Sequence, residues 1–153
     1  MRNLILASST AFALSTVSVW AADIAPSDVA FDEYGAVAAA LTQTPGDAAN
    51  GAKVFANRKL GNCLACHANA DMSDAPFHGE VGPPLDGVGS RWEAAELRGI
   101  VSNSKMTFPD TIMPAFYINA GYERALEKFE GKPILSAQDV EDLVAYLMTL
   151  TDE

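Results

Sequence analysis

The sequence predicts a small all-α fold whose helices are joined by long ordered loops, and three observations support this. The last part of the chain has apolar residues three and four positions apart, which is the spacing of an amphipathic helix. Segment 69–89 is rich in Gly, Pro, Asp and Ser, and prolines interrupt segment 105–116, so both favour loops. No βαβ pattern is visible. Because long loops are unusual in a compact domain, we expect these two to wrap a group other than protein.

The length, composition and charge of the chain exclude several classes of function. A chain of 153 residues is about one domain, and 49% apolar residues are enough to form a core. The 10 Lys and Arg residues are outnumbered by 20 Asp and Glu residues, which gives a net charge of -10. Nucleic acids and anionic membrane surfaces are bound through clustered basic residues, so neither is an expected partner.

The N-terminus has the pattern of a secretory signal peptide. Arg2 precedes an uncharged stretch over 4–19, and Ala21 and Ala22 offer small residues for cleavage. The alternative is a retained membrane anchor, but the stretch is short for a span and diluted by Ser and Thr. We therefore expect residues 1–22 to be cleaved and the mature protein to be exported to the periplasm without a membrane attachment.

The mature chain is expected to begin with an N-terminal arm over 23–45, followed by one domain over 46–153. Within the arm, the apolar stretch 36–41 could form a short helix. Leaving large apolar side chains in water is unfavourable, so we expect partial order in the arm. The side chains that suggest this are Val29, Phe31, Tyr34 and Val37.

The domain should open with a helix over 48–57, for which Asp47 is a suitable N-cap. Gly51 and Phe55 lie four residues apart and therefore share one face of this helix. We expect Phe55 to meet Tyr146 where the first and last helices cross. The absence of a side chain at Gly51 would permit the close approach.

Three further helices are expected. The segments 93–102 and 121–129 are candidates for short helices in the middle of the domain. The clearest helix is the last, because Ser136 and Asp139 have the spacing of a capping box. The apolar stripe of this helix consists of Val140, Leu143, Val144, Leu147 and Leu150.

The chemistry of the chain is concentrated in the sequence Cys63-Leu64-Ala65-Cys66-His67. In an exported protein, C-x-x-C-H is the attachment signal for c-type haem. Residues three apart on a helical turn lie on one side, so both thiols can reach the two vinyl groups of one porphyrin. The next residue, His67, then directs an imidazole nitrogen at the iron.

Other uses of two cysteines are less consistent with the sequence. A thioredoxin-like redox pair normally follows a strand in a βαβ pattern, which is absent here. A structural disulfide remains an alternative for the same two thiols. A zinc site would need a fourth ligand, and His78 is the only other histidine.

The iron bound by His67 needs a sixth ligand, for which Met113 is the leading candidate. Pro114 stiffens the backbone beside Met113 and keeps it outside regular structure, where a thioether can point at the iron. His78 is the main rival and Met106 a weaker one. Met72 follows His67 too closely to reach the other haem face, and Met148 suits the core of the last helix.

Three more residues are expected to contact the haem or its ligands. The Pro83 carbonyl is placed to accept a hydrogen bond from the second nitrogen of His67 and so fix the ring. Arg91 could pair with a haem propionate, and Trp92 could donate its indole N–H to one. The alternative for Arg91 is a solvated surface cation.

These features together resemble the class I cytochrome c family. The parts that carry the resemblance are Gly51 with Phe55, the motif 63–67, Gly82-Pro83-Pro84-Leu85, Met113-Pro114 and the closing helix with Tyr146. A narrower resemblance, from about Pro45 to Leu150, is to the SoxX family, the monohaem subunits of SoxAX cytochrome complexes in sulfur oxidation. It rests on segments 61–68, 76–88, 113–117 and 131–135, because the C-x-x-C-H motif alone is common to all c cytochromes.

The resemblance implies the class I cytochrome c fold around one covalent haem c, with His67 and Met113 as the iron ligands. SoxAX complexes are L-cysteine S-thiosulfotransferases that join thiosulfate oxidatively to a cysteine of the SoxYZ carrier. By resemblance, a SoxA-type subunit performs the sulfur chemistry, while this chain accepts electrons and passes them to a small soluble electron acceptor. This chain has no thiol left for sulfur transfer if haem occupies both cysteines.

Two other classes of function remain as alternatives. One is a free-standing periplasmic electron shuttle without an enzyme partner. The other is a haem enzyme or gas sensor, which would need an open sixth position on the iron. For a complex, we expect a docking patch at an exposed haem edge framed by Phe77, Phe108 and Phe116.

Overall fold

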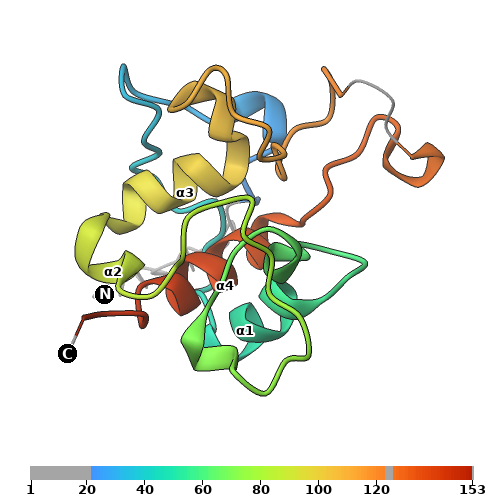
Figure 1. The fold of residues 1–153 in the computed structure, drawn as a ribbon. Coiled ribbons are helices and arrows are strands. Elements are labelled where there is room, and N and C mark those ends of the chain that lie inside the picture. The colour runs from blue at the N-terminus through green and yellow to red at the C-terminus, as the bar shows by residue number, and fades with distance from the viewer. Residues whose placement is uncertain (1–21, 123–125, 153) are drawn as a thin grey trace, which may run out of the picture.

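The computed structural model describes residues 22–122 and 126–152, and within them it contains helices and turns but no strand. The α-helices are α1 (Ala48–Ala56), α2 (Val88–Arg91), α3 (Ala94–Asn103) and α4 (Ala137–Leu147). Figure 1 shows α4 lying between α1 and α3, and α4 packs on both. Short 3₁₀ turns complete the fold at Pro26–Asp28, Cys63–Ala65, Ala70–Met72, Ser104–Met106 and Glu127–Phe129. The predicted all-α class is confirmed.

The crossing of α1 and α4 has the contacts that the sequence predicted. The Asp47 side chain caps α1 by accepting hydrogen bonds from the backbone N–H groups of the first turn. A Cβ at Gly51 would overlap the carbonyl oxygen of Asp142 on α4, so only glycine permits this approach. The rings of Phe55 and Tyr146 meet edge to face with their centroids 5.5 Å apart.

The other two long helices also begin as their sequences indicate. Ser136 and Asp139 form the predicted capping box at the start of α4. The apolar stripe of α4 is buried, and Leu150 is buried as well although the helix ends at Leu147. Helix α3 begins with a second capping box, formed by Glu93 and Glu96, and ends one residue beyond the predicted 93–102.

Two predicted helices were wrong, and a short one was missed. Segment 36–41 is not helical, because its backbone groups bond to other elements, as when Val37 N–H donates to the Ala95 carbonyl. Within the described part of 121–129, only the 3₁₀ turn Glu127–Phe129 is helical, and Leu126 beside it is 65% exposed, so this turn gains little from apolar burial there. Helix α2 begins inside the segment that was predicted to be a loop.

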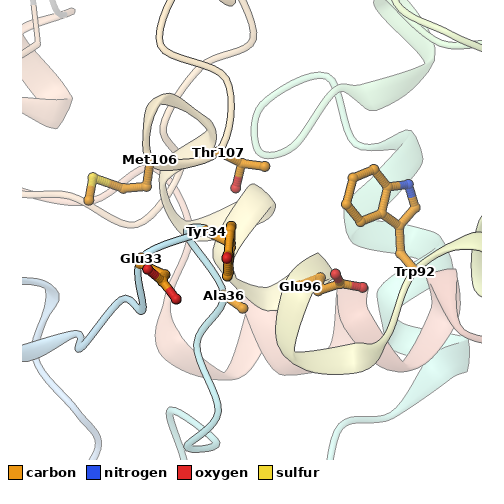
Figure 2. Close-up of a pocket in the computed structure, with 7 residues that line it drawn as sticks. All are labelled: Glu33, Tyr34, Ala36, Trp92, Glu96, Met106 and Thr107. Atoms are coloured by element: carbon orange, nitrogen blue, oxygen red, sulfur yellow. The ribbon is translucent and has the colours of Figure 1, made fainter.

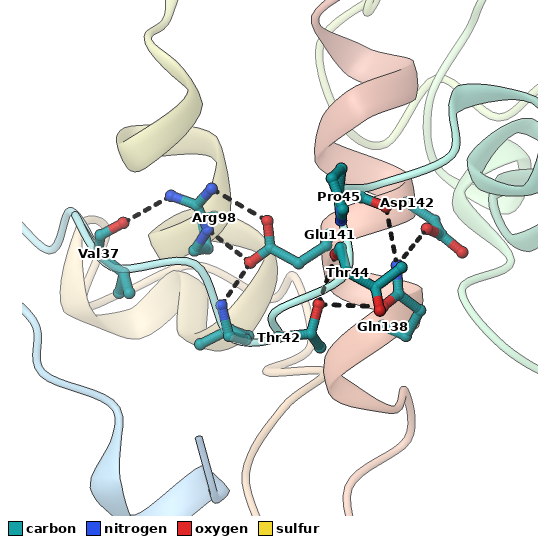
Figure 3. Close-up of polar contacts among 9 residues, drawn as sticks. Val37, Thr42, Thr44, Pro45, Arg98, Gln138, Glu141 and Asp142 are labelled. Atoms are coloured by element: carbon teal, nitrogen blue, oxygen red, sulfur yellow. Dashed lines mark hydrogen bonds and ion pairs between the residues drawn. The ribbon is translucent and has the colours of Figure 1, made fainter. Parts of the chain in front are cut away.

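The N-terminal arm is anchored on α3 and α4 by a buried ion pair (Figure 3). Arg98 donates from Nε to Glu141 Oε1 at 2.7 Å and from Nη2 to Oε2 at 3.0 Å. The same pair holds arm backbone, because Arg98 also donates to the Val37 carbonyl and Glu141 accepts from Leu41 N–H. Val37 and Leu41 are buried, whereas Tyr34 is 74% exposed, so the expected partial order extends to most of the arm but not to that ring.

The predicted leader, residues 1–22, lies outside the described residues apart from Ala22. Among the helices of residues 22–122 and 126–152, none has the length and hydropathy needed to cross a bilayer.

Candidate haem site

The C-x-x-C-H segment forms a tight turn directly after α1. Asn62 enters the turn in the left-handed conformation, at φ 49°. The backbone N–H groups of Cys66 and His67 both donate to the Cys63 carbonyl, at 3.0 and 2.9 Å. Cys63 and Cys66 are not joined to each other in a disulfide. The turn therefore holds the two sulfur atoms and the imidazole on one short piece of chain.

A second loop runs beside this turn and is bonded to it through its backbone. Gly79 N–H donates to the Leu64 carbonyl at 2.8 Å, and Gly82 N–H donates to the Cys66 carbonyl at 2.8 Å. A Cβ at Gly79 would overlap the Ala65 carbonyl oxygen, so the two chains touch at backbone level. This is why the Gly- and Pro-rich segment is ordered although it lacks long helices.

The second loop also fixes the His67 ring. His67 Nδ1 lies 2.7 Å from the Pro83 carbonyl oxygen, which is the hydrogen bond expected from the sequence. A carbonyl can only accept, so Nδ1 carries the proton and Nε2 has a free lone pair for a metal. Gly82 lies against the same ring, where a Cβ would overlap the imidazole carbon Cε1. The imidazole is therefore oriented before any metal binds.

Met113 reaches the site from the loop that follows α3. Its backbone N–H donates to Thr111 Oγ1 at 3.2 Å. Its carbonyl accepts from Ser104 Oγ at 2.7 Å and from the Lys105 ammonium. Met113 is half-buried, and its backbone is held from both sides although it belongs to no helix.

One cavity of about 480 Å³ brings these segments together. Six of the seven residues predicted to contact haem line it, and they are Cys63, Cys66, His67, Pro83, Trp92 and Met113. The remaining wall is largely apolar and comes from α1, α3, α4 and the loops, with Phe55, Leu97, Val101, Phe116, Leu143 and Leu147 among its residues. An apolar cavity with two thiols, an imidazole and a thioether fits a flat apolar cofactor with a central iron.

The other candidates for the sixth iron ligand lie outside this cavity. Among the described methionines and histidines, neither Met72, Met148 nor His78 lines this cavity. His78 uses both ring nitrogens on backbone groups, since Nδ1 accepts from Asn69 N–H and Nε2 lies 3.0 Å from the Met72 carbonyl. Figure 2 shows Met106 at a separate cavity of about 390 Å³. Met113 is thus the methionine that the fold brings to the cavity of His67.

Arg91 and Trp92 have different surroundings although they are neighbours. Arg91 does not line the cavity, and its guanidinium donates to the carbonyls of Asp86 and Pro84. It therefore braces the loop that presents Pro83, and its contact with a propionate stays a prediction. Trp92 lines both cavities and packs edge to face on Phe108, with the centroids 6.1 Å apart.

The protonation of Cys63 argues against a thiol-based redox site. Burial, reinforced by the neighbouring charge of Cys66 and partly opposed by a backbone hydrogen bond, raises the pKa of the Cys63 thiol to about 12. Reactive cysteine pairs need the opposite shift, because the thiolate is the nucleophile. The unmodified thiol of Cys63 is therefore neutral at physiological pH.

Several residues contact His67 or Met113, or line the cavity mouth, although the sequence did not predict these contacts. Gly82 and Ser104 act on His67 and Met113 through contact and hydrogen bonding. The cavity mouth has Val81 and Ile112, which are 64% and 80% exposed. A serine or valine has no sequence signal for such a role, whereas Gly82 could have been suspected from its place before two prolines.

The prediction that Phe77, Phe108 and Phe116 frame an exposed haem edge is only partly correct. Phe108 lines the cavity and is 43% exposed, so it does stand at the mouth. Phe116 is buried and forms part of the wall instead. Phe77 is exposed but does not line the cavity. The difference arises because Phe116 bonds back to the end of α3, where its N–H donates to the Val101 carbonyl.

Comparisons with known proteins agree with this site. The model of the cytochrome c family matches residues 48–151, and with the Cys63 and Cys66 pair it indicates covalently bound haem c. The chain is similar to the crystal structure of SoxXA from P. pantotrophus, with 47% sequence identity and a TM-score of 0.80. The likeness covers 86% of this chain and 100% of that chain. A comparison with curated protein sequences gave no match. The chain therefore belongs to the cytochrome c family, and its resemblance to SoxX is confirmed.

Proposed function

We propose that the chain is the electron-transfer subunit of a SoxAX-type complex, with one haem c held between His67 and Met113. The observation that carries this is the shared cavity, which collects both thiols, the imidazole and one thioether from two separate loops. The 47% identity to a chain of SoxXA over its whole length supports the same assignment.

The two proposed iron ligands, His67 and Met113, suit an iron that transfers electrons rather than one that binds and transforms a substrate. When bound, haem c supplies a one-electron change between Fe(III) and Fe(II). A neutral, soft thioether favours the reduced metal, so Met/His ligation raises the reduction potential. His67 and Met113 would both hold the iron, so the chain's own side chains would keep oxygen or substrate from binding to it. This argues against the haem enzyme and the gas sensor.

The sulfur chemistry belongs to a partner. Both cysteines of this chain line the haem cavity, and the described residues contain no other thiol. Joining thiosulfate to a cysteine thiol of SoxYZ forms a sulfur–sulfur bond and releases two electrons and one proton. A single haem accepts one electron at a time, so a small soluble acceptor must oxidise this chain twice per turnover. The chain then serves an L-cysteine S-thiosulfotransferase without performing its bond-forming step.

The mouth of the cavity is where we place the SoxA-type subunit. Val81, Phe108 and Ile112 are exposed apolar residues that line the haem cavity. Exposed apolar residues that cluster around a functional cavity are typical of a protein interface. A partner that covers them would bring its own haem close to this one.

Export completes the proposal. We propose that residues 1–22 are a cleaved leader, that 23–45 form the arm and that 46–153 form the cytochrome domain in the periplasm. An intact mass of the purified chain that corresponds to a start at Asp23 supports cleavage after Ala22, and a mass that includes Met1 contradicts it.

Purification from the native periplasm tests the function directly. We expect one haem per chain, resistant to denaturing gels, and a second haem-bearing subunit that co-purifies in equal amount. Cys63→Ala should weaken the haem stain of the denatured chain, which checks the covalent link separately from the partner. A chain that carries haem but purifies alone under gentle conditions would favour the free-standing shuttle.

A further inference from the structure

The carbonyl of Met113 accepts hydrogen bonds from two consecutive side chains. Ser104 Oγ donates to it at 2.7 Å and lies 3.4 Å from the Pro114 carbonyl. The Lys105 ammonium donates to the same Met113 oxygen and to the Thr111 carbonyl at 2.9 Å. A buried hydroxyl and an exposed ammonium thus converge on one backbone atom of the loop.

These contacts connect the loop to α3. Ser104 is fully buried and stands at the end of α3, where the helix gives way to the turn Ser104–Met106. After Met113 the chain is fastened again, because Tyr117 N–H donates to the Ser102 carbonyl at 2.9 Å. Between these two attachments, Met113 is held by the Ser104 and Lys105 donors at its carbonyl and by its own N–H, which donates to Thr111 Oγ1 at 3.2 Å.

We propose that Ser104 and Lys105 are positioning residues that hold the Met113 thioether at the iron. This rests on the proposed function, in which Met113 is the sixth ligand. Neither residue touches the iron, and each acts through the Met113 backbone. Removing either donor raises the fraction of molecules in which the loop has swung away, and an external ligand binds only to that fraction.

The chain contains a closely matched control for Ser104. Ser102 lies two residues earlier, at the end of the same helix, and is also fully buried. Its hydroxyl oxygen has no hydrogen-bond partner among the described residues. Ser102→Ala and Ser104→Ala therefore remove the same atom from equally buried positions, and only the second loses bonds to the Met113 loop.

Imidazole is the probe for the open loop, and its binding is titrated by the absorption spectrum of the ferric holoprotein. We expect Ser104→Ala to raise the apparent imidazole affinity about tenfold, as the loss of one buried hydrogen bond implies. Ser102→Ala should leave the affinity unchanged. Equal affinities in the two variants would overturn the role of Ser104.

Lys105 provides a second test at an exposed position that folding tolerates. Lys105→Met removes the ammonium at similar length and should raise the imidazole affinity about twofold to threefold, because exposed charged hydrogen bonds contribute less. Lys105→Arg restores a charged donor and should return the affinity towards that of the unsubstituted protein. An unchanged affinity in Lys105→Met overturns the role of Lys105.

Met113→Ala separates this inference from the function on which it rests. If Met113 is the ligand, Met113→Ala abolishes the weak red absorption band of thioether-bound ferric iron. A band that persists in Met113→Ala contradicts the ligand assignment itself. A band lost in Met113→Ala, with no change in either positioning variant, contradicts only the roles of Ser104 and Lys105.

Discussion

The helical scaffold and the two loops that carry the proposed iron ligands, His67 and Met113, are held in different ways. Helices α1, α3 and α4 pack through large buried side chains, such as Phe55 and Leu143, and through a backbone approach at Gly51. The loops instead depend on individual hydrogen bonds: His67 Nδ1 donates to the Pro83 carbonyl, and the Ser104 hydroxyl donates to the Met113 carbonyl.

We therefore expect helix packing to determine the stability of the fold, and the loop hydrogen bonds to determine the positions of the two proposed iron ligands. Burial of apolar surface is additive and non-directional, so it sets how firmly the scaffold folds. A hydrogen bond adds only about 1 kcal/mol net, but it fixes direction. We therefore expect scaffold variants to change the free energy of unfolding most, and loop variants to change the spectrum most.

Arg98→Met should have the largest effect on stability. It leaves Glu141 buried beside the arm without its cation, which costs about 3 to 5 kcal/mol of unfolding free energy. Chemical denaturation followed by circular dichroism measures this. The red absorption band should survive in the fraction that remains folded, because neither residue lines the haem cavity. A loss of less than 1 kcal/mol would mean that the pair is not what anchors the arm.

The double variant Arg98→Met with Glu141→Leu sharpens this result. Removing both charges relieves the uncompensated carboxylate, so part of the stability should return. Recovery should be incomplete, because the Val37 carbonyl and Leu41 N–H then lose their side-chain partners.

Gly82→Ala tests the loop side of the comparison. The new Cβ would overlap the His67 ring, so the imidazole must turn or the loop must retreat. We expect a loss of about 1 to 3 kcal/mol in stability and a clear shift of the haem spectrum. Gly131→Ala is the control, because nothing lies within 4 Å of a Cβ there and only its positive φ is strained. Identical spectra for both variants would mean that the ring is not held by this contact.

Asp142 is expected to show the smallest effect, as a pH dependence of stability. Burial alone would raise the pKa of Asp142, but hydrogen bonds from Asp47 N–H, Asn50 and Gln138 outweigh it and lower the pKa. A lowered folded-state pKa contributes stability that is fully present above the unfolded-state pKa of about 4, and this stability is lost as the pH falls below about 4 and through the lower folded-state pKa.

Asp142→Asn should therefore reduce stability by about 1 kcal/mol at neutral pH and flatten its decline below about pH 4. Thermal unfolding between neutral and acidic pH measures both effects. Asp74→Asn, at an exposed carboxylate, is the matched control and should leave the profile unchanged. An acid decline as steep in Asp142→Asn as in the unsubstituted protein would assign the effect to other groups.

The sequence predicts the parts of the fold that local rules determine. Asp47 and Ser136 begin their helices as N-caps, and the spacing of Gly51, Phe55 and Tyr146 correctly predicts the crossing of α1 and α4. The two caps depend on residues close in sequence, and the crossing depends on Gly51 and Phe55 sharing one face of α1. The hydrogen bond between His67 and Pro83 was also foreseeable, because a rigid carbonyl so often orients a ligating imidazole.

Tertiary contacts decide what the sequence could not predict. The stretch 36–41 resembles a helix in composition, but its backbone bonds to Arg98 and Glu141, far along the chain, and it is not helical. Ser104 carries no motif, and its role depends on where α3 ends relative to Met113. Phe116 lies in a segment that the sequence predicts to be a loop. It lines the cavity because this loop folds back on α3.

We propose that His67 and Met113 hold one haem iron between two loops of a single cavity. The most direct measurement is the absorption spectrum of ferric Met113→Ala, compared with Met106→Ala as its control. The claim predicts that the thioether band disappears in the first variant and persists in the second. A band that persists in Met113→Ala and disappears in Met106→Ala would contradict it.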